Sequence, residues 1–102
     1  QSELFVFLEQ NTLRNIQFED FNYSVAPDGR VSLTMRGRAR SFGTVALQSD
    51  VFGKNRFIRD PIFSDLNLDQ IGNVIFKFSA FVDPTLISYR AALERVNSEV
   101  TP

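Results

Sequence analysis

The chain contains no cysteine and no histidine among its 102 residues. Without cysteine it can form no disulfide, zinc finger, iron–sulfur cluster or thiol nucleophile. Without histidine it lacks the commonest general base and the commonest metal ligand in proteins, and a Ser-His-Asp triad is impossible. We therefore expect a protein that is not an enzyme, with no catalytic residues, no cofactor and no metal site.

The chain also has no strong excess of positive or negative charge and no long apolar run. The net charge is −1 and the isoelectric point is about 5.3. Domains that bind nucleic acid are usually strongly basic, so nucleic acid is not an expected partner. No apolar run is long enough to cross a membrane, and the first residues lack the charged start and cleavage site of a signal peptide. One soluble domain covering residues 1–102 is expected.

Phenylalanine is abundant, with 11 residues, so the core is expected to be built largely on its rings. The clearest pattern is the alternation over residues 31–40, which predicts a strand with one buried and one wet face. Its inward residues are apolar or small: Val31, Leu33, Met35, Gly37 and Ala39. Its outward residues are polar, and three of them are arginines: Ser32, Thr34, Arg36, Arg38 and Arg40.

The segment "APDGR" predicts the turn that joins this strand to an earlier one over residues 15–25. A three-residue loop, Pro27 to Gly29, pairs Val25 with Val31 and keeps both apolar faces on one side. The apolar positions change from odd to even further upstream, which predicts a β-bulge near Glu19 and Asp20. Beyond that bulge, Phe18 is expected to face Gly37.

Helices are predicted on both sides of this hairpin. The opening stretch 2–12 favours a helix, and a second is expected from the N-cap Ser41, with Phe42 in its apolar stripe and Gly53 at its end. A second hairpin follows over residues 59–82, with Ile62 inward and Pro61 placing its first strand at a sheet edge. A closing helix over about 84–97 is capped by Asp83.

The order αββαββ plus a C-terminal helix predicts an α+β fold, namely a ferredoxin-like domain that is circularly permuted. It would have a four-stranded antiparallel sheet with helices mainly on one face and the second and fourth strands in its centre. The other face would be open.

Two interpretations fit the outward arginines: a patch that binds phosphate or an acidic partner, or solvated strand residues paired across the hairpin. Exposed apolar residues on the open face favour a protein interface, and the first strand is a long aromatic edge that could pair with another chain. The open face is expected to contribute Arg36, Arg38, Phe63, Ile75 and Phe81. The first strand contributes Phe18 and Tyr23, and these seven residues are the interaction candidates.

Three stretches carry a resemblance to a known family: "IQFEDFNYSV", "VSLTMRGRARSFGTVALQSDVF" and "FIRDPIFSDLNLDQIGNVIFKFSAFV". From about Leu4 to Val82 the chain resembles the extracytoplasmic domain of PilN, the fimbrial-assembly family of bacterial type IV pilus machines. The pattern is diffuse and apolar rather than a sharp catalytic motif. The same architecture occurs in GspL-type components of type II secretion.

The resemblance implies a permuted ferredoxin-like domain on the periplasmic face of the inner membrane. Such domains form homodimers or heterodimers with a PilO-like protein, and they contact other pilus assembly proteins in the alignment complex. The family's short cytoplasmic motif and membrane helix are absent here, so anchoring would depend on a segment outside this chain. The closing helix lies outside the part that matches.

Two other functions remain open from the residues. The first is a sensing module that binds a small ligand or nucleic acid on the open sheet face. The second is an acylphosphatase-like enzyme, which would need a phosphate-cradling loop that the sequence does not show.

Overall fold

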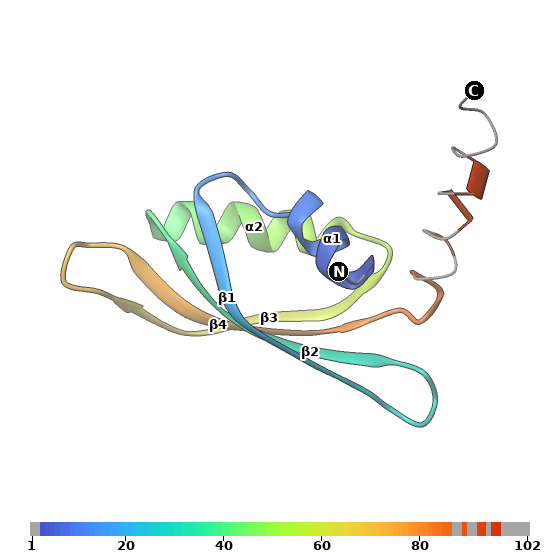
Figure 1. Ribbon diagram of the computed structural model, residues 1–102. Helices are drawn as coiled ribbons and strands as arrows, with labels where there is room; N and C mark the ends of the chain where they lie inside the picture. The colour runs from blue at the N-terminus through green and yellow to red at the C-terminus, as the bar shows by residue number, and fades with distance from the viewer. Residues whose placement is uncertain (1–2, 87–88, 90–91, 94, 97–102) are drawn as a thin grey trace.

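The computed structural model describes residues 3–86, 89, 92–93 and 95–96 (Figure 1). From residue 3 to residue 82, two helices and four strands follow one another in the order αββαββ. Their bounds are α1 Glu3–Gln10, β1 Ile16–Val25, β2 Val31–Ala39, α2 Phe42–Lys54, β3 Ile58–Leu68 and β4 Val74–Val82. The expected elements are thus present in the expected order.

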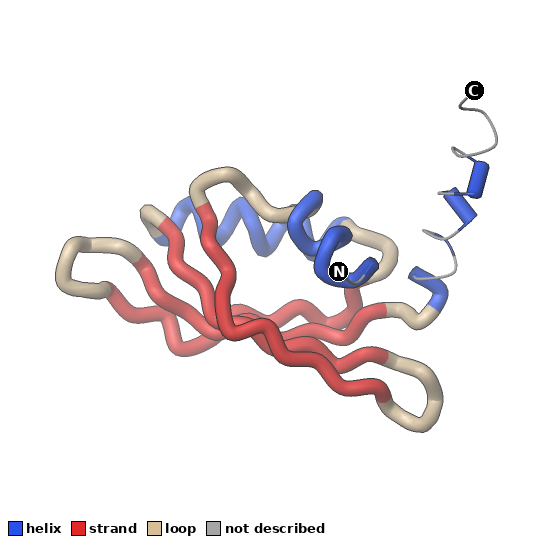
Figure 2. The backbone as a smooth tube through the Cα atoms, viewed as in Figure 1, coloured by secondary structure: helices blue, strands red, loops and turns tan. Residues whose placement is uncertain are grey.

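The four strands form one antiparallel sheet in the order β1-β2-β4-β3. Both helices lie on the same face of this sheet, and the opposite face is open (Figure 2). This confirms the α+β, ferredoxin-like class and the central position of β2 and β4. Pro61, which has no N–H for a ladder bond, lies on the edge strand β3 as predicted.

Both hairpins close through three-residue loops that end in glycine. The Ala26 N–H donates to the Arg30 carbonyl at 2.8 Å, and the Asp69 N–H donates to the Asn73 carbonyl at 2.8 Å. Gly29 and Gly72 have φ values of 88° and 89°, which a side chain would strain. The predicted register follows, with Val25 opposite Val31.

The small residues of β2 make room for rings. Phe18 lies opposite Gly37, as predicted, and Gly37 also pairs with Phe76 on the other side. A β-carbon at Gly37 would clash with the Phe76 ring and lie 3.1 Å from Phe18. A strand position buried between two phenylalanines therefore requires glycine here.

Three β-bulges interrupt the edge strands, and each has an aspartate in the left-handed region. These residues are Asp20, Asp60 and Asp65, with φ values of 54°, 51° and 53°. The bulge at Asp20 was predicted. The two in β3, after Arg59 and after Ser64, were not.

The β3 bulges correct the predicted place of Phe63. The first bulge shifts the strand by one residue, so Ile62 points to the open face and is 55% exposed. Phe63 points to the helix side instead, where its ring centroid lies 4.8 Å from that of Phe78. The second bulge restores the phase. A simple alternating pattern cannot show two compensating bulges, so the open-face assignment of Phe63 was wrong.

Helix α2 begins as predicted but ends later. The Thr44 N–H donates to the Ser41 side chain at 3.2 Å, which confirms the N-cap. Gly53 lies inside the helix rather than ending it, and Phe42 is exposed rather than part of the buried stripe. The buried stripe of α2 consists of Thr44, Val45, Gln48 and Phe52, of which Thr44 and Gln48 are polar.

The closing helix is described only in part. The described residues of this segment are helical: Thr85, Leu86, Tyr89, Ala92, Leu93, Arg95 and Val96. The Thr85 N–H and hydroxyl both donate to the Asp83 carboxylate, at 2.9 and 2.7 Å, so Asp83 is the cap that was expected. Pro84 is in a turn, and the remaining residues of the predicted 84–97 helix lie outside the described residues.

Candidate interaction surfaces

The seven residues that the sequence singles out fall in three different places. Four lie on the open face of the sheet: Arg36, Arg38, Ile75 and Phe81. Tyr23 and Phe18 lie on β1 with their side chains toward the helix layer, because they pair with Leu33 and Gly37. Phe63 packs against the core. The structure therefore brings them together on no single surface.

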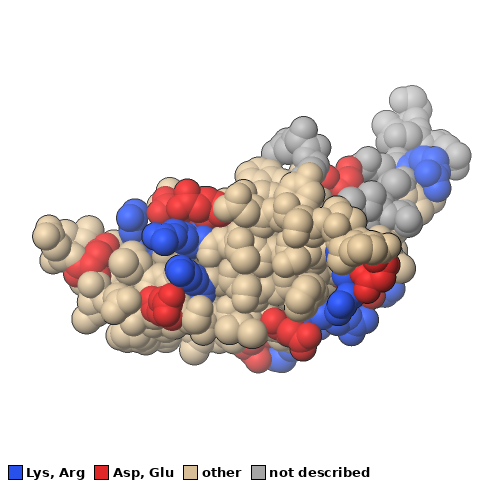
Figure 3. All heavy atoms as spheres, turned by 90° about the horizontal axis from the view of Figure 1, so that it is seen from below, with Lys and Arg blue, Asp and Glu red and all other residues tan. Residues whose placement is uncertain are grey.

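The open face carries charges of both signs side by side (Figure 3). Arg36 lies between Glu19 and Lys77 in adjacent strands. Lys77 contacts the Asp65 carboxylate at 3.4 Å, and Arg38 lies 3.8 Å from that of Asp69. Arg36 makes no ion pair with any described residue. Paired charges of this kind are typical of a solvated strand face.

The apolar residues of the open face do not form a large patch. The Arg30 guanidinium lies over the Phe81 ring, 5.0 Å from its centroid, and covers part of it. Ile75 is 38% exposed but stands between Arg38 and Asn67 in the sheet. The open face thus combines scattered apolar atoms with polar neighbours.

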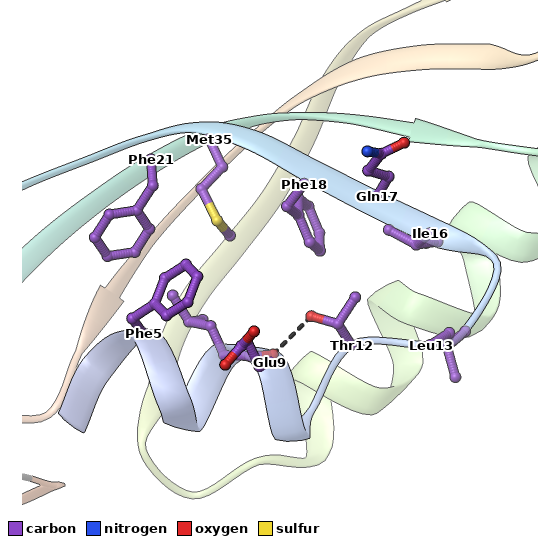
Figure 4. Close-up of a pocket in the computed structure, with 10 residues that line it drawn as sticks. Phe5, Glu9, Thr12, Leu13, Ile16, Gln17, Phe18, Phe21 and Met35 are labelled. Carbon is purple, nitrogen blue, oxygen red and sulfur yellow. Dashed lines mark hydrogen bonds between the residues drawn. The ribbon is translucent and has the colours of Figure 1, made fainter. Parts of the chain in front are cut away.

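A groove of about 350 Å³ opens between α1 and β1 on the helix side of the sheet (Figure 4). Phe5 of α1 and Phe21 of β1 lie at one end of it and Leu13 and Ile16 at the other, with Met35 and Phe18 between them. Its lining is mostly apolar: Phe5, Leu8, Glu9, Thr12, Leu13, Ile16, Gln17, Phe18, Phe21 and Met35. The sequence patterns did not predict this groove.

Aromatic contacts extend the groove along the edge strand. The Phe5 and Phe21 rings meet edge to face with centroids 6.0 Å apart, and the Phe21 and Tyr23 centroids are 5.7 Å apart. Tyr23 is 55% exposed and Val25 63% exposed. We call the groove together with Phe5, Phe21, Tyr23 and Val25 the α1–β1 surface.

A buried glutamine fixes the inner end of this groove. Gln48 of α2 has no exposed surface. Its amide donates to the Asn11 carbonyl at 2.8 Å and accepts from the Leu13 N–H at 2.8 Å. These bonds tie the α1–β1 connection to α2, so the groove is held open in the folded chain. The helical spacing from Val45 to Gln48 and Phe52 is the signal that could have revealed it.

Among the described residues, the carboxyl groups with a shifted pKa are those of Asp28 and Asp83, and neither belongs to the α1–β1 surface. The backbone N–H of Arg30 lowers the pKa of Asp28, and the Thr85 hydroxyl lowers the pKa of Asp83. Both carboxylates stabilise turns of the chain, because Asp28 accepts the Arg30 N–H and Asp83 accepts the Thr85 N–H. Within the described part of the chain, no three acidic side chains gather closely enough to bind a metal ion.

Comparison of the chain with known protein families, with curated proteins and with solved structures found no match. Among the described residues, no helix is long and apolar enough to span a membrane.

Proposed function

We propose that this chain is a non-enzymatic protein–protein interaction domain of the PilN type, which dimerises with itself or with a PilO-like protein. Its place would be the periplasmic face of the inner membrane, within a type IV pilus or pseudopilus assembly machine. Two observations support the proposal: the resemblance of residues 4–82 to that family, and the αββαββ order with helices on one sheet face.

The α1–β1 surface carries the proposal. It is a continuous apolar area that starts in a groove and extends over Tyr23 and Val25, each more than half exposed. Large contiguous apolar patches on soluble domains usually mark protein interfaces, and exposed tyrosines are frequent anchors in them. A partner that places an apolar side chain in the groove, against the Phe5 and Phe21 rings, would bury this area.

Side-chain docking fits this surface better than strand addition. The bulge at Asp20 divides the β1 edge into two short halves, Ile16–Glu19 and Asn22–Val25. Bulged edge strands pair poorly with a strand from another chain. The aromatic rings on the helix side are therefore the proposed contacts, rather than the backbone of the edge.

Sedimentation equilibrium of the purified chain, alone and with a PilO-type domain, tests the proposal. We expect association, and we expect Tyr23→Ser to weaken it by about 10-fold or more, as for an interface anchor. Leu47→Ser is the matched control, because Leu47 is 62% exposed on α2, outside the α1–β1 surface. A chain that stays monomeric with and without the partner would refute the proposal.

A further inference from the structure

A cleft rich in arginine lies at the end of the sheet where β1 begins and β2 ends. It has a volume of about 400 Å³. Its polar lining comes from the segment before β1, from β1 and β2, and from the β3–β4 turn: Arg14, Asn15, Gln17, Arg38, Arg40 and Asn73. No acidic residue lines it.

The strand register builds this cleft. Ala39 pairs with Ile16 on one side and with Val74 on the other. Arg40 follows Ala39 directly, Asn15 precedes Ile16 and Asn73 precedes Val74, so these three residues lie at the same end of the sheet. Arg38 pairs with Gln17 in the adjacent row. Arg38 and Arg40 thus line the cleft together with Asn15, Gln17 and Asn73.

The charges of the cleft are mostly uncompensated. Five of the basic side chains in the described part of the chain pair with an aspartate: Arg30, Arg38, Lys54, Arg59 and Lys77. Arg14 and Arg40 make no ion pair with a described residue. The partner of Arg38, Asp69, is 3.8 Å away and also accepts the N–H groups of Ile71 and Asn73.

The site suits a single compact anion rather than a polymer. Three arginines line one cavity in a chain whose net charge is −1. Beyond Arg38 the open face alternates in sign, with Glu19 and Asp65 beside Arg36 and Lys77, so no basic track continues from the cleft. A nucleic-acid strand would need such a track.

We propose that this cleft binds a phosphate group. Guanidinium forks match the oxygens of phosphate in pairs, and the amides of Asn15, Gln17 and Asn73 can donate further hydrogen bonds. The Asn15 amide also donates to the Thr44 hydroxyl of α2 at 3.4 Å, which helps to hold Asn15 in place. The volume leaves room for part of the alcohol of a phosphomonoester, either a soluble one or a lipid headgroup.

Titration of the isotope-labelled chain with inorganic phosphate, at constant ionic strength adjusted with chloride, tests this site. We expect saturable amide shifts centred on residues 14–17, 38–40 and 73. Arg40→Gln should weaken binding by about 10-fold or more, the usual loss for a charged hydrogen bond. Arg36→Gln is the matched control, an unpaired arginine on the same strand face outside the cleft, and should change the affinity less than about 2-fold.

Flotation with phosphatidylcholine vesicles, with and without phosphatidic acid, separates the two phosphate sources. Binding that needs phosphatidic acid and is lost in Arg40→Gln but not in Arg36→Gln identifies a lipid headgroup. Saturable binding of inorganic phosphate without vesicle binding identifies a soluble phosphomonoester. Unsaturable shifts spread over all exposed arginines, or equal losses in the two variants, would overturn the proposal.

Discussion

Two helix–hairpin units, residues 3–39 and 42–82, form the sheet and its cover, and they differ mainly in their helices. Helix α2 has 13 residues and buries Val45, Gln48 and Phe52. Helix α1 has 8 residues and leaves Phe5 partly exposed over a groove. The shorter helix leaves apolar sheet uncovered, which shows how one architecture yields a closed half and a half with a free surface.

At the centre of the sheet, in contrast, the two units are packed in the same way. Gly37 of β2 lies opposite the large Phe76, and Ala80 of β4 lies opposite the large Leu33. The pair Met35–Phe78 stands midway between them. Small residues thus receive large ones at matching positions, so the difference between the units comes from the helix layer and the edge strands.

Gln48 of the second unit forms hydrogen bonds to the first unit. Its substitution should therefore have the largest effect on stability. Gln48→Ala leaves the Asn11 carbonyl and the Leu13 N–H without their partner. We expect the free energy of unfolding to fall by about 3 kcal/mol, from these two groups and the cavity. Urea denaturation measures this. Gln70→Ala, at an exposed turn position, is the control and should change it by less than about 0.5 kcal/mol.

Substitution of Gly37 should disturb the packing at the centre of the sheet. Gly37→Ala forces the Phe76 ring to move, and we expect a loss of about 2 kcal/mol from overpacking. Gly53→Ala is the matched control because nothing lies within 4 Å of its added β-carbon inside α2. That change should instead stabilise the chain by about 0.5–1 kcal/mol. A Gly37→Ala chain as stable as wild type would contradict the packing described.

The bulges are a feature that both units share, and they should respond alike. Asp20→Ala and Asp60→Ala place alanine in the left-handed region, so each should cost about 1 kcal/mol. Asp20→Asn and Asp60→Asn should be nearly neutral, since asparagine tolerates this conformation. Thermal unfolding of the four variants tests the prediction. An alanine variant as stable as its asparagine counterpart would show that the bulge has relaxed.

The smallest effect concerns Asp83, the cap at the end of the second unit. Its pKa is lowered below the ordinary value of 3.8, chiefly by the hydrogen bond from the Thr85 hydroxyl. A lowered folded pKa adds stability above the ordinary value, and this stability is lost as the pH falls through the folded pKa. The stability difference between wild type and Asp83→Asn should therefore shrink on acidification below pH 3.8. A difference that stays constant with pH would contradict this role.

Local chemistry made much of the fold predictable. Alternation in β2, the two glycine-ended loops, the phase change at Asp20 and the Ser41 cap each depend on a few neighbouring residues. The β3 bulges were not predicted because their two shifts cancel, so that a short stretch between them, Ile62 to Ser64, changes sides while the rest of the strand keeps the expected alternation. The α1–β1 surface and the arginine cleft were not predicted, because each is formed by segments that are distant in the sequence. The surface brings Phe5 close to Phe21, and the cleft brings Arg14 close to Arg40. Such proximity depends on how the chain packs and not on local sequence.

Amide hydrogen exchange of the chain, alone at low concentration and in complex with its dimer partner, shows which face of the sheet the partner covers. We expect slower exchange in the complex over residues 5–9 and 21–25, the two segments that carry the α1–β1 surface. Slower exchange confined to residues of the open face, such as Arg36, Ile75 and Phe81, would contradict it.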